Sequence, residues 1–336
     1  MKAITKAAVY EKLITGIGAI LEKGRHKAYV AVNTILVETY WQIGWYIVEY
    51  EQQGRRKVEY GSKLFDKLSK DLRIRYGKGF NRSNLIYIRL LYLKYPKSQT
   101  LSNQLTWSHY VLLLGVSDDF ARSFYERQCI NEKWSVRELK RQVNSMLFER
   151  LALSKDKKWV LKLSRQGHSV EKHEDIIKEP YLLEFLKIPE NYKYSEKELE
   201  QKIIDNLQMF LLELGKGFSF AGRQYRISIG ENHFYVDLLF YHSILKCFVL
   251  IDLKIKRATH LDVGQMNMYL NYFKKEEMTE GDNEPIGIIL AADRNDVTVE
   301  YALGGISNRL FVSKYKLYLP DKNELREKVR QLLENK

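Results

Sequence analysis

The sequence predicts an α+β protein, in which an all-helical amino-terminal domain precedes an α/β domain with a mixed sheet. Three observations support this fold class. In the first half of the chain, apolar residues recur at helical spacing. From Tyr181 onward, short segments rich in β-branched and aromatic residues alternate with helical stretches. The order there is helix, helix, β-hairpins, helix, strand, strand, which suits a mixed sheet with helices on its faces.

Helical spacing predicts the amino-terminal elements in turn. A helix is expected over residues 28–51, with an interruption at Gly44, and another over residues 62–75. Gly77 then breaks the pattern, and Asn81 or Ser83 can cap a following helix that ends before Pro96. Two further helices are expected between residues 121 and 153. The first domain is therefore expected to be helical throughout.

β-patterned runs predict the strands of the second half, which are expected at residues 224–229, 234–241, 247–254, 286–291 and 310–318. A helix is expected from about residue 262 to residue 277. A polar stretch between residues 153 and 179 indicates a boundary. We therefore expect domains at residues 1–155 and 181–336, joined by a polar linker at 156–180.

The positive charge of the chain lies almost entirely in its first half. Residues 1–150 hold 26 Lys and Arg against 14 Asp and Glu, whereas residues 151–336 hold 29 against 28. Such a surplus raises the local concentration of polyanions and favours salt-sensitive phosphate binding. The first domain is therefore expected to bind nucleic acid, although a basic face that serves only solubility is the alternative.

The two helices around Gly77 suggest how this domain would bind. Helix, glycine-containing turn and helix make a helix-turn-helix arrangement, whose second helix can enter a duplex groove. The residues at its amino end are polar or basic, and with one lysine of the turn they form the candidate nucleic-acid-binding set: Lys78, Asn81, Arg82, Ser83 and Asn84. A helical hairpin that binds nothing has the same pattern.

Two aspartates and a lysine stand in neighbouring β-patterned segments of the second half. If the turn between these segments is centred on residues 243–246, antiparallel pairing places Asp237 opposite Asp252, with Cβ atoms roughly 5 Å apart. Side chains alternate along a strand, so Lys254 shares the face of Asp252. The alternative is a hairpin whose acidic and basic side chains merely pair at a sheet end.

Two carboxylates at that distance repel each other unless one is protonated or a cation lies between them. Mg²⁺ or Mn²⁺ fits, because such ions take oxygen ligands and leave positions open for water and phosphate. The ammonium of Lys254 could then orient or help deprotonate an attacking water and offset charge on a phosphoryl transition state. The spacing therefore predicts a metal-dependent phosphodiesterase site.

The same residues resemble the PD-(D/E)xK nuclease superfamily, whose signature is an acid on one strand followed by (D/E)-x-K on the next. Asp237 and Asp252-Leu253-Lys254 match it, and Gln265 with Tyr269 has the Q-xxx-Y form of the RecB-like branch. The resemblance implies a restriction-endonuclease-like fold and a metal held by both aspartates and the carbonyl of Leu253. It also implies that Gln265 supports the site and that Tyr269 can reach the substrate.

Longer motifs resemble the bacterial YhcG-type proteins, a family of predicted nucleases. They run through most of the chain and include residues 40–44, 60–64, 77–85, 105–110, 134–139, 210–218 and 222–225. In the superfamily a glutamate on the helix before the sheet completes the metal site, and Glu213 is the matching position. A solvated glutamate at a helix end is the alternative for Glu213. The chain departs from the family by having Asp252 where a glutamate is usual, which shortens that side chain.

The hypothesis is a DNA nuclease dependent on Mg²⁺ or Mn²⁺, acting in defence, restriction or repair, with two chains side by side if both strands are cut. RNA is the weaker choice of substrate, because nothing in the site reads the sugar. The competing hypothesis is a non-catalytic module that holds nucleic acid within a restriction-type or mobile-element complex. Endo or exo cleavage, specificity and the partner are left open by the sequence.

Several other classes of protein are not expected. Cys129 and Cys247 are the only cysteines, which argues against a disulfide framework or a cysteine zinc site and suggests the cytoplasm. The sequence shows neither a signal peptide nor an apolar run of about 18 residues, so no membrane span is expected. A Gly-rich phosphate loop ending in Lys-Ser/Thr is also missing, so no ATP motor is expected.

Overall fold

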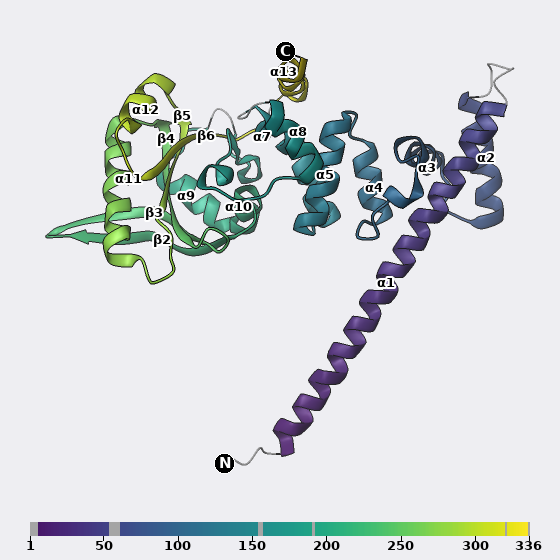
Figure 1. Cartoon of the computed structure of the whole chain (residues 1–336), viewed down its shortest axis with the longest axis horizontal. Coiled ribbons are helices and arrows are strands. Elements are labelled where there is room, and N and C mark those ends of the chain that lie inside the picture. The colour runs from purple at the N-terminus through teal and green to yellow at the C-terminus, as the bar shows by residue number, and fades with distance from the viewer. Residues whose placement is uncertain (1–5, 54–60, 154–156, 190–191, 320, 335–336) are drawn as a thin grey trace. The chain divides into compact units, whose positions relative to one another are not determined.

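A computed structural model describes residues 6–53, 61–153, 157–189, 192–319 and 321–334 (Figure 1). The chain divides into two compact units, which are considered separately below. The first consists of Met1–Arg122 and Lys133–Leu139, and the second of Ser123–Glu132 and Lys140–Lys336. No helix in the described ranges is both long enough and apolar enough to cross a membrane.

The amino-terminal part of the chain is helical, as expected. Its helices are α1 (Lys6–Gln53), α2 (Gly61–Tyr76), α3 (Arg82–Lys94), η1 (Ser98–Thr100), α4 (Trp107–Leu114), α5 (Asp119–Glu132), α6 (Val136–Asn144) and α7 (Leu147–Ala152). In the first unit, Ile47, Phe65, Leu85 and Ile88 form a buried cluster that joins α1, α2 and α3.

The helix, turn and helix predicted around Gly77 is confirmed as local structure. α2 ends at Tyr76, and Gly77 has a positive φ of 94°, a conformation that glycine adopts without strain. α3 begins after Asn81, whose side chain accepts a hydrogen bond of 2.8 Å from the backbone amide of Asn84. Of the two caps that the sequence offered, Asn81 and Ser83, the structure uses Asn81.

α1 differs from the prediction in length and continuity. It begins at Lys6 and runs through Gly44 without a break. Gly44 is buried against α3, where a Cβ added to the glycine would lie 2.3 Å from the carbonyl oxygen of Ile88. Gly44 is therefore a point of close helix packing, and the expected interruption there is wrong.

The stretch predicted as a polar linker is partly folded in the second unit. It contains α8 (Lys157–Gln166) and η2 (His173–Ile176). Val160 and Leu163 of α8 are buried, which explains why a segment with four basic residues forms a packed helix.

The second unit is built on a six-stranded sheet of order β1-β6-β5-β4-β3-β2. Its strands are β1 (Tyr181–Leu182), β2 (Phe218–Ile229), β3 (Asn232–His242), β4 (Cys247–Arg257), β5 (Ile286–Asp293) and β6 (Arg309–Lys316). β2, β3 and β4 are antiparallel neighbours, whereas β4, β5, β6 and β1 run parallel. The predicted mixed sheet is thus confirmed.

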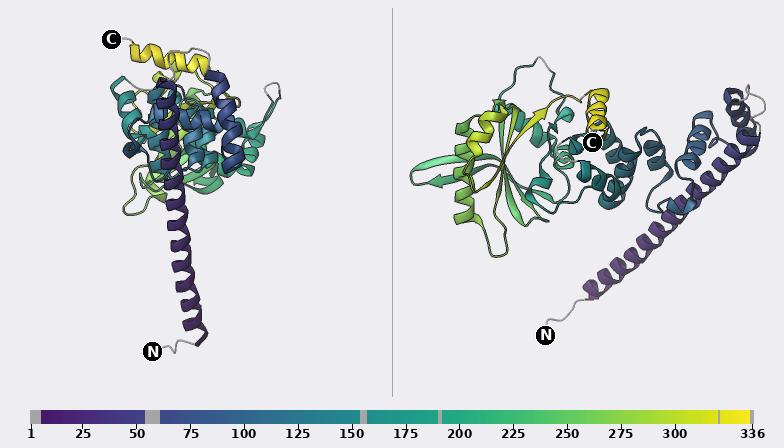
Figure 2. Two further views of the ribbon diagram at one scale, coloured as in Figure 1. Left: turned by 90° about the vertical axis from the view of Figure 1, so that its right-hand side faces the viewer. Right: turned by 45° about the horizontal axis from the view of Figure 1, so that its top comes forward.

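Helices cover both faces of this sheet (Figure 2). They are η3 (Glu184–Leu186), α9 (Glu196–Asp205), α10 (Leu207–Leu214), α11 (His260–Tyr272), η4 (Phe273–Glu277) and α12 (Asp296–Leu303). α13 (Lys322–Glu334) follows the last strand and packs on α7 instead. One buried core joins Leu199 and Phe210 of α9 and α10 to Ile251 of β4. The other joins Met266 and Leu270 of α11 to Leu250, which points to the opposite face of β4.

Candidate active site

The β3–β4 hairpin has the register that the sequence predicted. Leu238 pairs with Ile251 and His242 with Cys247, so the ladder places Asp237 and Asp252 across from each other at its next position. The two carboxyl groups are in hydrogen-bond contact. The structure therefore brings the predicted pair of acids together.

Burial makes this pair of carboxyl groups electrostatically costly. Asp252 is only 4% exposed, and burial together with the charge of Asp237 raises the pKa of Asp252 to about 7. Lys254 partly offsets this cost, since its Nζ lies 2.9 Å from Asp252 Oδ2 and 3.7 Å from Asp262 Oδ1. Burial opposes the charge of Lys254, but the attraction of Asp252 holds its pKa above the usual value.

Asp237 is held in place by two hydrogen bonds. The backbone amide of Leu253 donates to Asp237 Oδ2 at 2.8 Å, and the side-chain amide of Gln224 donates to Asp237 Oδ1 at 3.0 Å. Gln224 stands on β2 with a positive φ of 46°, between the paired residues Arg223 and Tyr225. This uncommon backbone conformation directs an amide into the carboxylate pair.

Glu200 of α9 is a further acid at this site that sequence reasoning missed. Gln224 Nε2 donates to Glu200 Oε2 at 2.6 Å, so one amide lies between Glu200 and Asp237. Burial, and then the charge of Asp237, raise the pKa of Glu200. A signal was present in the sequence, since Glu200 falls beside Leu199 and Ile203 on the apolar face of its helix.

Gln265 and Tyr269 lie one helical turn apart on α11, and the Gln265 amide donates to the Tyr269 hydroxyl. That hydroxyl also donates to the carbonyl of Tyr235 at 3.3 Å, and it lies close enough to Asp252 to feel its charge. Tyr269 is fully buried in the structure, so it offers no surface to nucleic acid, and its predicted contact with the substrate has no support. It supports Gln265 and the backbone of β3 instead.

Glu213 does not join the carboxylate pair in the structure. It is fully buried on α10, where Oε1 accepts from Arg150 at 2.7 Å and Oε2 accepts from Arg141 at 3.2 Å. Lys178 donates to its backbone carbonyl. Burial opposes the charge of Glu213, but these cations hold its pKa at about 2. Because arginines occupy both oxygens, the prediction that Glu213 binds metal has no support.

The candidate nucleic-acid-binding residues of the first unit are mostly exposed. Lys78, Asn81, Arg82 and Ser83 all face solvent, and Arg82 pairs with Asp66 at 3.1 Å. Asn84 is partly buried, since it donates to the carbonyl of Gly79 and accepts from the Trp107 indole. Asn84 thus holds the turn together, and the Asn81 side chain caps α3. Lys78 and Ser83 are the exposed members of the set for which no such role is seen.

The donors at the pair are oxygen atoms, with neither histidine nor cysteine among them. In the part of the chain that the structure describes, no three His, Cys, Asp or Glu side chains converge as a metal site. Glu200 lies near the pair of aspartates, with the Gln224 side-chain amide between Glu200 and Asp237. Two repelling carboxyl groups and a third acid one amide away suit a hard divalent cation.

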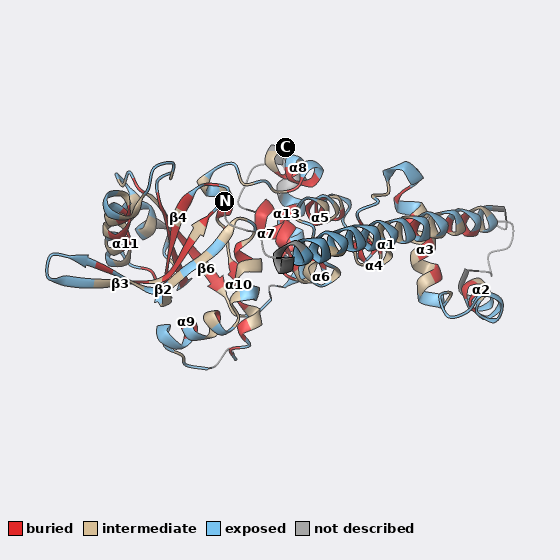
Figure 3. Cartoon of the chain, turned by 90° about the horizontal axis from the view of Figure 1, so that it is seen from below, coloured by how far each residue is buried: buried red, intermediate tan, exposed pale blue. Residues whose placement is uncertain are grey.

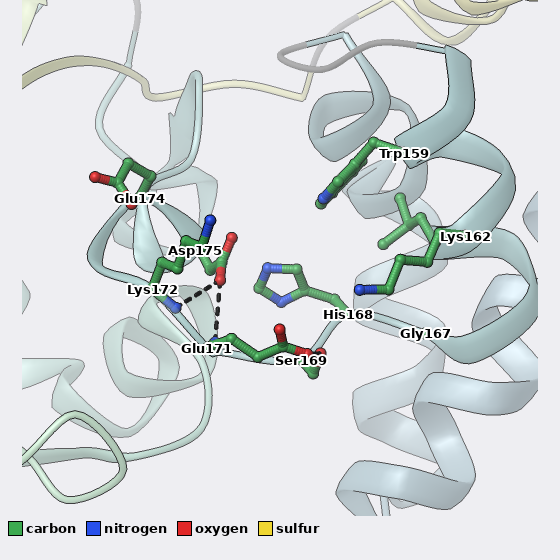
Figure 4. Close-up of a pocket in the computed structure, with 10 residues that line it drawn as sticks. Trp159, Lys162, Gly167, His168, Ser169, Glu171, Lys172, Glu174 and Asp175 are labelled. Atoms are coloured by element: carbon green, nitrogen blue, oxygen red, sulfur yellow. Dashed lines mark hydrogen bonds between the residues drawn. The ribbon is translucent and has the colours of Figure 1, made fainter.

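A pocket of about 390 Å³ lies elsewhere in the second unit (Figure 4). Its walls come from α8 and η2 with the loop between them, and they include Trp159, Lys162, His168 and Lys172. Asp175 accepts hydrogen bonds from the backbone amides of Glu171 and Lys172 and so shapes one wall. The pocket lining includes neither Asp237 nor Asp252, and its mixed charges favour no one ligand.

Two family models match the chain. The YhcG PDDEXK nuclease domain matches residues 174–330, and the DUF1016 N-terminal domain matches residues 16–150. The chain is 38% identical over 354 aligned residues to "Putative nuclease YhcG" of Escherichia coli (strain K12), across 96% of this chain and 94% of that protein.

Solved structures resemble only part of the chain. The crystal structure of a repair endonuclease from Pyrococcus abyssi matches 39% of this chain and 50% of its own, with 23% identity and a TM-score of 0.28. The EndoMS–dsDNA2 complex matches 40% of this chain and 51% of its own, with 21% identity and a TM-score of 0.28.

The mixed sheet and the matched domain together define a nuclease of the PD-(D/E)xK class with a helical domain before it. Nucleases of this class generally use divalent metal ions. The chain belongs to the YhcG family, as its identity over nearly the whole length shows. The family resemblance drawn from the sequence is confirmed.

Proposed function

We propose that the protein is a deoxyribonuclease that uses Mg²⁺ or Mn²⁺ and cuts within DNA strands. The observation that carries this proposal is the contact between the carboxyl groups of Asp237 and Asp252, with the ammonium of Lys254 2.9 Å from Asp252. Two acids beside a lysine, where the pairing of β3 with β4 ends, can supply the metal ligands and the positive charge that metal-assisted phosphoryl transfer uses.

The position of each residue suggests a separate role. Asp237, Asp252 and the carbonyl of Leu253 would hold the metal ion, and Glu200 would complete the ligand set when Gln224 turns aside. When bound, the ion supplies a Lewis acid and a water of lowered pKa. Lys254 would orient the attacking water and offset charge on the phosphoryl group. Gln265, supported by Tyr269, would position Lys254 or the substrate.

DNA would reach this site through the basic first half of the chain. Exposed Lys78 in the turn and Arg82 at the start of α3 supply positive charge where a helix-turn-helix meets phosphates. Cys129 and Cys247 are buried free thiols, which suits the reducing cytoplasm. The proposed setting of DNA defence, restriction or repair rests on the family resemblance alone.

The test is a cleavage assay with the purified full chain on supercoiled, linear, single-stranded and branched DNA, and on RNA. Each substrate is incubated with Mg²⁺, Mn²⁺ or chelator. Lys254→Ala removes the ammonium beside the pair and is expected to lower the rate roughly 100-fold or more. Lys256→Ala is the matched control, because Lys256 is exposed two residues further along β4.

Metal-dependent cleavage of DNA that is lost in Lys254→Ala and kept in Lys256→Ala supports the proposal. Cleavage in chelator, or full activity of Lys254→Ala, contradicts it. If DNA is bound but not cut with either metal, the non-catalytic module is favoured. If RNA is cut and DNA is not, the substrate is RNA and the proposed deoxyribonuclease activity is wrong. Mn²⁺ titration of Asp237→Asn by calorimetry tests the metal ligands separately from turnover.

A further inference from the structure

The amino-terminal half of α1 exposes a continuous row of apolar and small side chains. Figure 3 shows this half of the helix as exposed along its length, and Figure 1 shows it running clear of α2, α3 and α4. Ile17 is 46% exposed, Leu21 54% and Ile35 62%. The row, here called the α1 stripe, consists of Tyr10, Ile14, Ile17, Leu21, Gly24, Ala28, Ala31 and Ile35.

The stripe faces away from the side of α1 that packs within its own unit. Val37 and Gly44 make that packed side, and both are buried. Ala28 precedes Val37 by nine residues, and Ile35 precedes Gly44 by nine. At about 100° per residue, nine residues place two side chains on opposite sides of a helix. The helices that cover Val37 and Gly44 therefore leave the stripe uncovered.

The spacing of the stripe is that of a coiled coil. Its positions alternate steps of four and three residues from Tyr10 to Ile35, which is the a and d pattern of a heptad repeat. We propose that the α1 stripe binds the same stripe of a second copy of this chain, in an antiparallel coiled coil. This inference does not rest on the nuclease function.

The exposed area is large enough for such a dimer. Leu13 and Ile20 flank the stripe and are 56% and 73% exposed, so the apolar surface is wider than the eight positions alone. At roughly 80 Å² for each of about ten side chains, one copy offers on the order of 800 Å², which is what one partner contributes to an interface of standard size. Self-pairing also gives a closed two-fold interface.

Charge and side-chain size favour the antiparallel orientation. Glu11 and Arg25 both flank the stripe at the e position, and antiparallel helices bring each Glu11 beside Arg25 of the second copy. The same register sets Ile14 opposite Gly24 and Tyr10 opposite Ala28, so that large side chains meet small ones. Nothing lies within 4 Å of a Cβ built on Gly24, which leaves room for a partner.

Sedimentation of the full chain between about 1 and 100 μM tests the proposal. The wild-type chain is expected to sediment as a dimer, and Ile17→Asp is expected to raise the dissociation constant about 100-fold or more by burying a charge. Ala19→Asp is the matched control, because Ala19 is exposed and lies on the side of the helix opposite Tyr10 and Ala28. It should leave the dimer intact, and circular dichroism should show equal helix content in both variants.

A wild-type chain that stays monomeric at all concentrations overturns the proposal, and so does a dimer that persists in Ile17→Asp. A charge exchange tests the orientation. Glu11→Arg sets like charges together at two symmetric places and should weaken the dimer about fivefold, whereas Glu11→Arg with Arg25→Glu should restore it. A double variant no tighter than Glu11→Arg alone overturns the antiparallel arrangement.

Discussion

Glu200 and Asp237 share one hydrogen-bond donor, the side-chain amide of Gln224. An amide between two acids supplies one of the positive partners that buried carboxylates need, and a divalent cation supplies a stronger one. Glu200 is 6% exposed, and burial and the charge of Asp237 raise its pKa. Its carboxyl group is therefore close enough to interact electrostatically with the aspartate pair. We therefore expect Glu200 to act with the two aspartates.

Glu200→Gln is predicted to weaken Mn²⁺ binding by the full chain about tenfold and to lower the cleavage rate. The physical reason is the loss of one negative oxygen donor beside the pair. Glu198→Gln is the control on the same helix, since glutamine at that position can preserve the capping box with Ser195. Calorimetry with Mn²⁺ measures the effect, and equal affinities for the two variants would count against a role for Glu200.

Glu213 is predicted to serve stability. Glu213→Gln would leave Arg150 and Arg141 buried without their anionic partner, which typically costs about 3–5 kcal/mol in the free energy of unfolding. Urea unfolding at pH 7 measures this cost, with exposed Glu280→Gln as a control that should change little. At a temperature where the variant stays folded, its Mn²⁺ affinity should equal that of wild type.

The same change has a defined pH dependence. The pKa of Glu213 falls from 4.5 to about 2 on folding, so its ionised form stabilises the protein above about pH 4.5. This contribution is lost as the pH falls toward 2, because protonation then becomes favourable in both states. The stability gap between wild type and Glu213→Gln should therefore narrow over that range, and a gap that is constant with pH would contradict this account.

Local sequence was sufficient for one part of the site and insufficient for the other. The register of Asp237 and Asp252 follows from a short hairpin, whose turn fixes which residues pair. Glu200 reaches the site only because α9 packs on β4, a contact between distant segments that no short motif encodes. The sequence correctly placed Glu213 on the helix before the sheet. It did not reveal the arginine partners of Glu213, which lie 63 and 72 residues away along the chain.

At the scale of elements, the packing of α1 on α3 depends on the missing side chain of Gly44. Gly44→Ala would place a Cβ 2.3 Å from the Ile88 carbonyl oxygen, so two helix backbones would have to move apart. Such overpacking is predicted to cost about 1–3 kcal/mol. Gly16→Ala in the exposed part of the same helix has nothing within 4 Å and should be neutral or slightly stabilising.

Thermal unfolding followed by circular dichroism compares these two variants. A lower midpoint for Gly44→Ala than for Gly16→Ala is expected, and equal midpoints would show that α1 and α3 adjust without cost. The position also explains an error of prediction. Glycine usually weakens a helix, so the sequence predicts an interruption at Gly44. In the structure a glycine is needed there because α3, from another part of the sequence, packs closely against α1.

Helices whose own sequence has a clear apolar periodicity were predicted more completely than helices without it. α2 and α3 match the expected bounds within two residues, because turn, cap and spacing all agree. The helix ranges expected from apolar spacing left out the amino-terminal 22 residues of α1 and the whole of α8. In α8 the buried apolar residues Val160 and Leu163 stabilise a helix that carries four basic residues.

At the scale of the whole molecule, the separation of charge between the two halves predicts where DNA gains its salt-dependent affinity. Residues 1–150 carry a net charge of +12, and residues 151–336 carry +1. Counterion release by phosphate-binding lysines makes affinity fall as salt rises. Lys78 is exposed at the turn before α3, whereas Lys97 is exposed beyond its other end, about 20 Å away along a helix of 13 residues.

Lys78→Glu is therefore predicted to weaken binding of duplex DNA in chelator and to reduce the slope of log affinity against log salt by about one unit. Lys97→Glu makes the same charge change at the far end of α3 and should leave that slope nearly unchanged. Fluorescence anisotropy of a labelled duplex between about 50 and 300 mM salt separates the two. If both variants weaken binding equally, the overall positive charge attracts the DNA, and the turn before α3 is not a specific contact site.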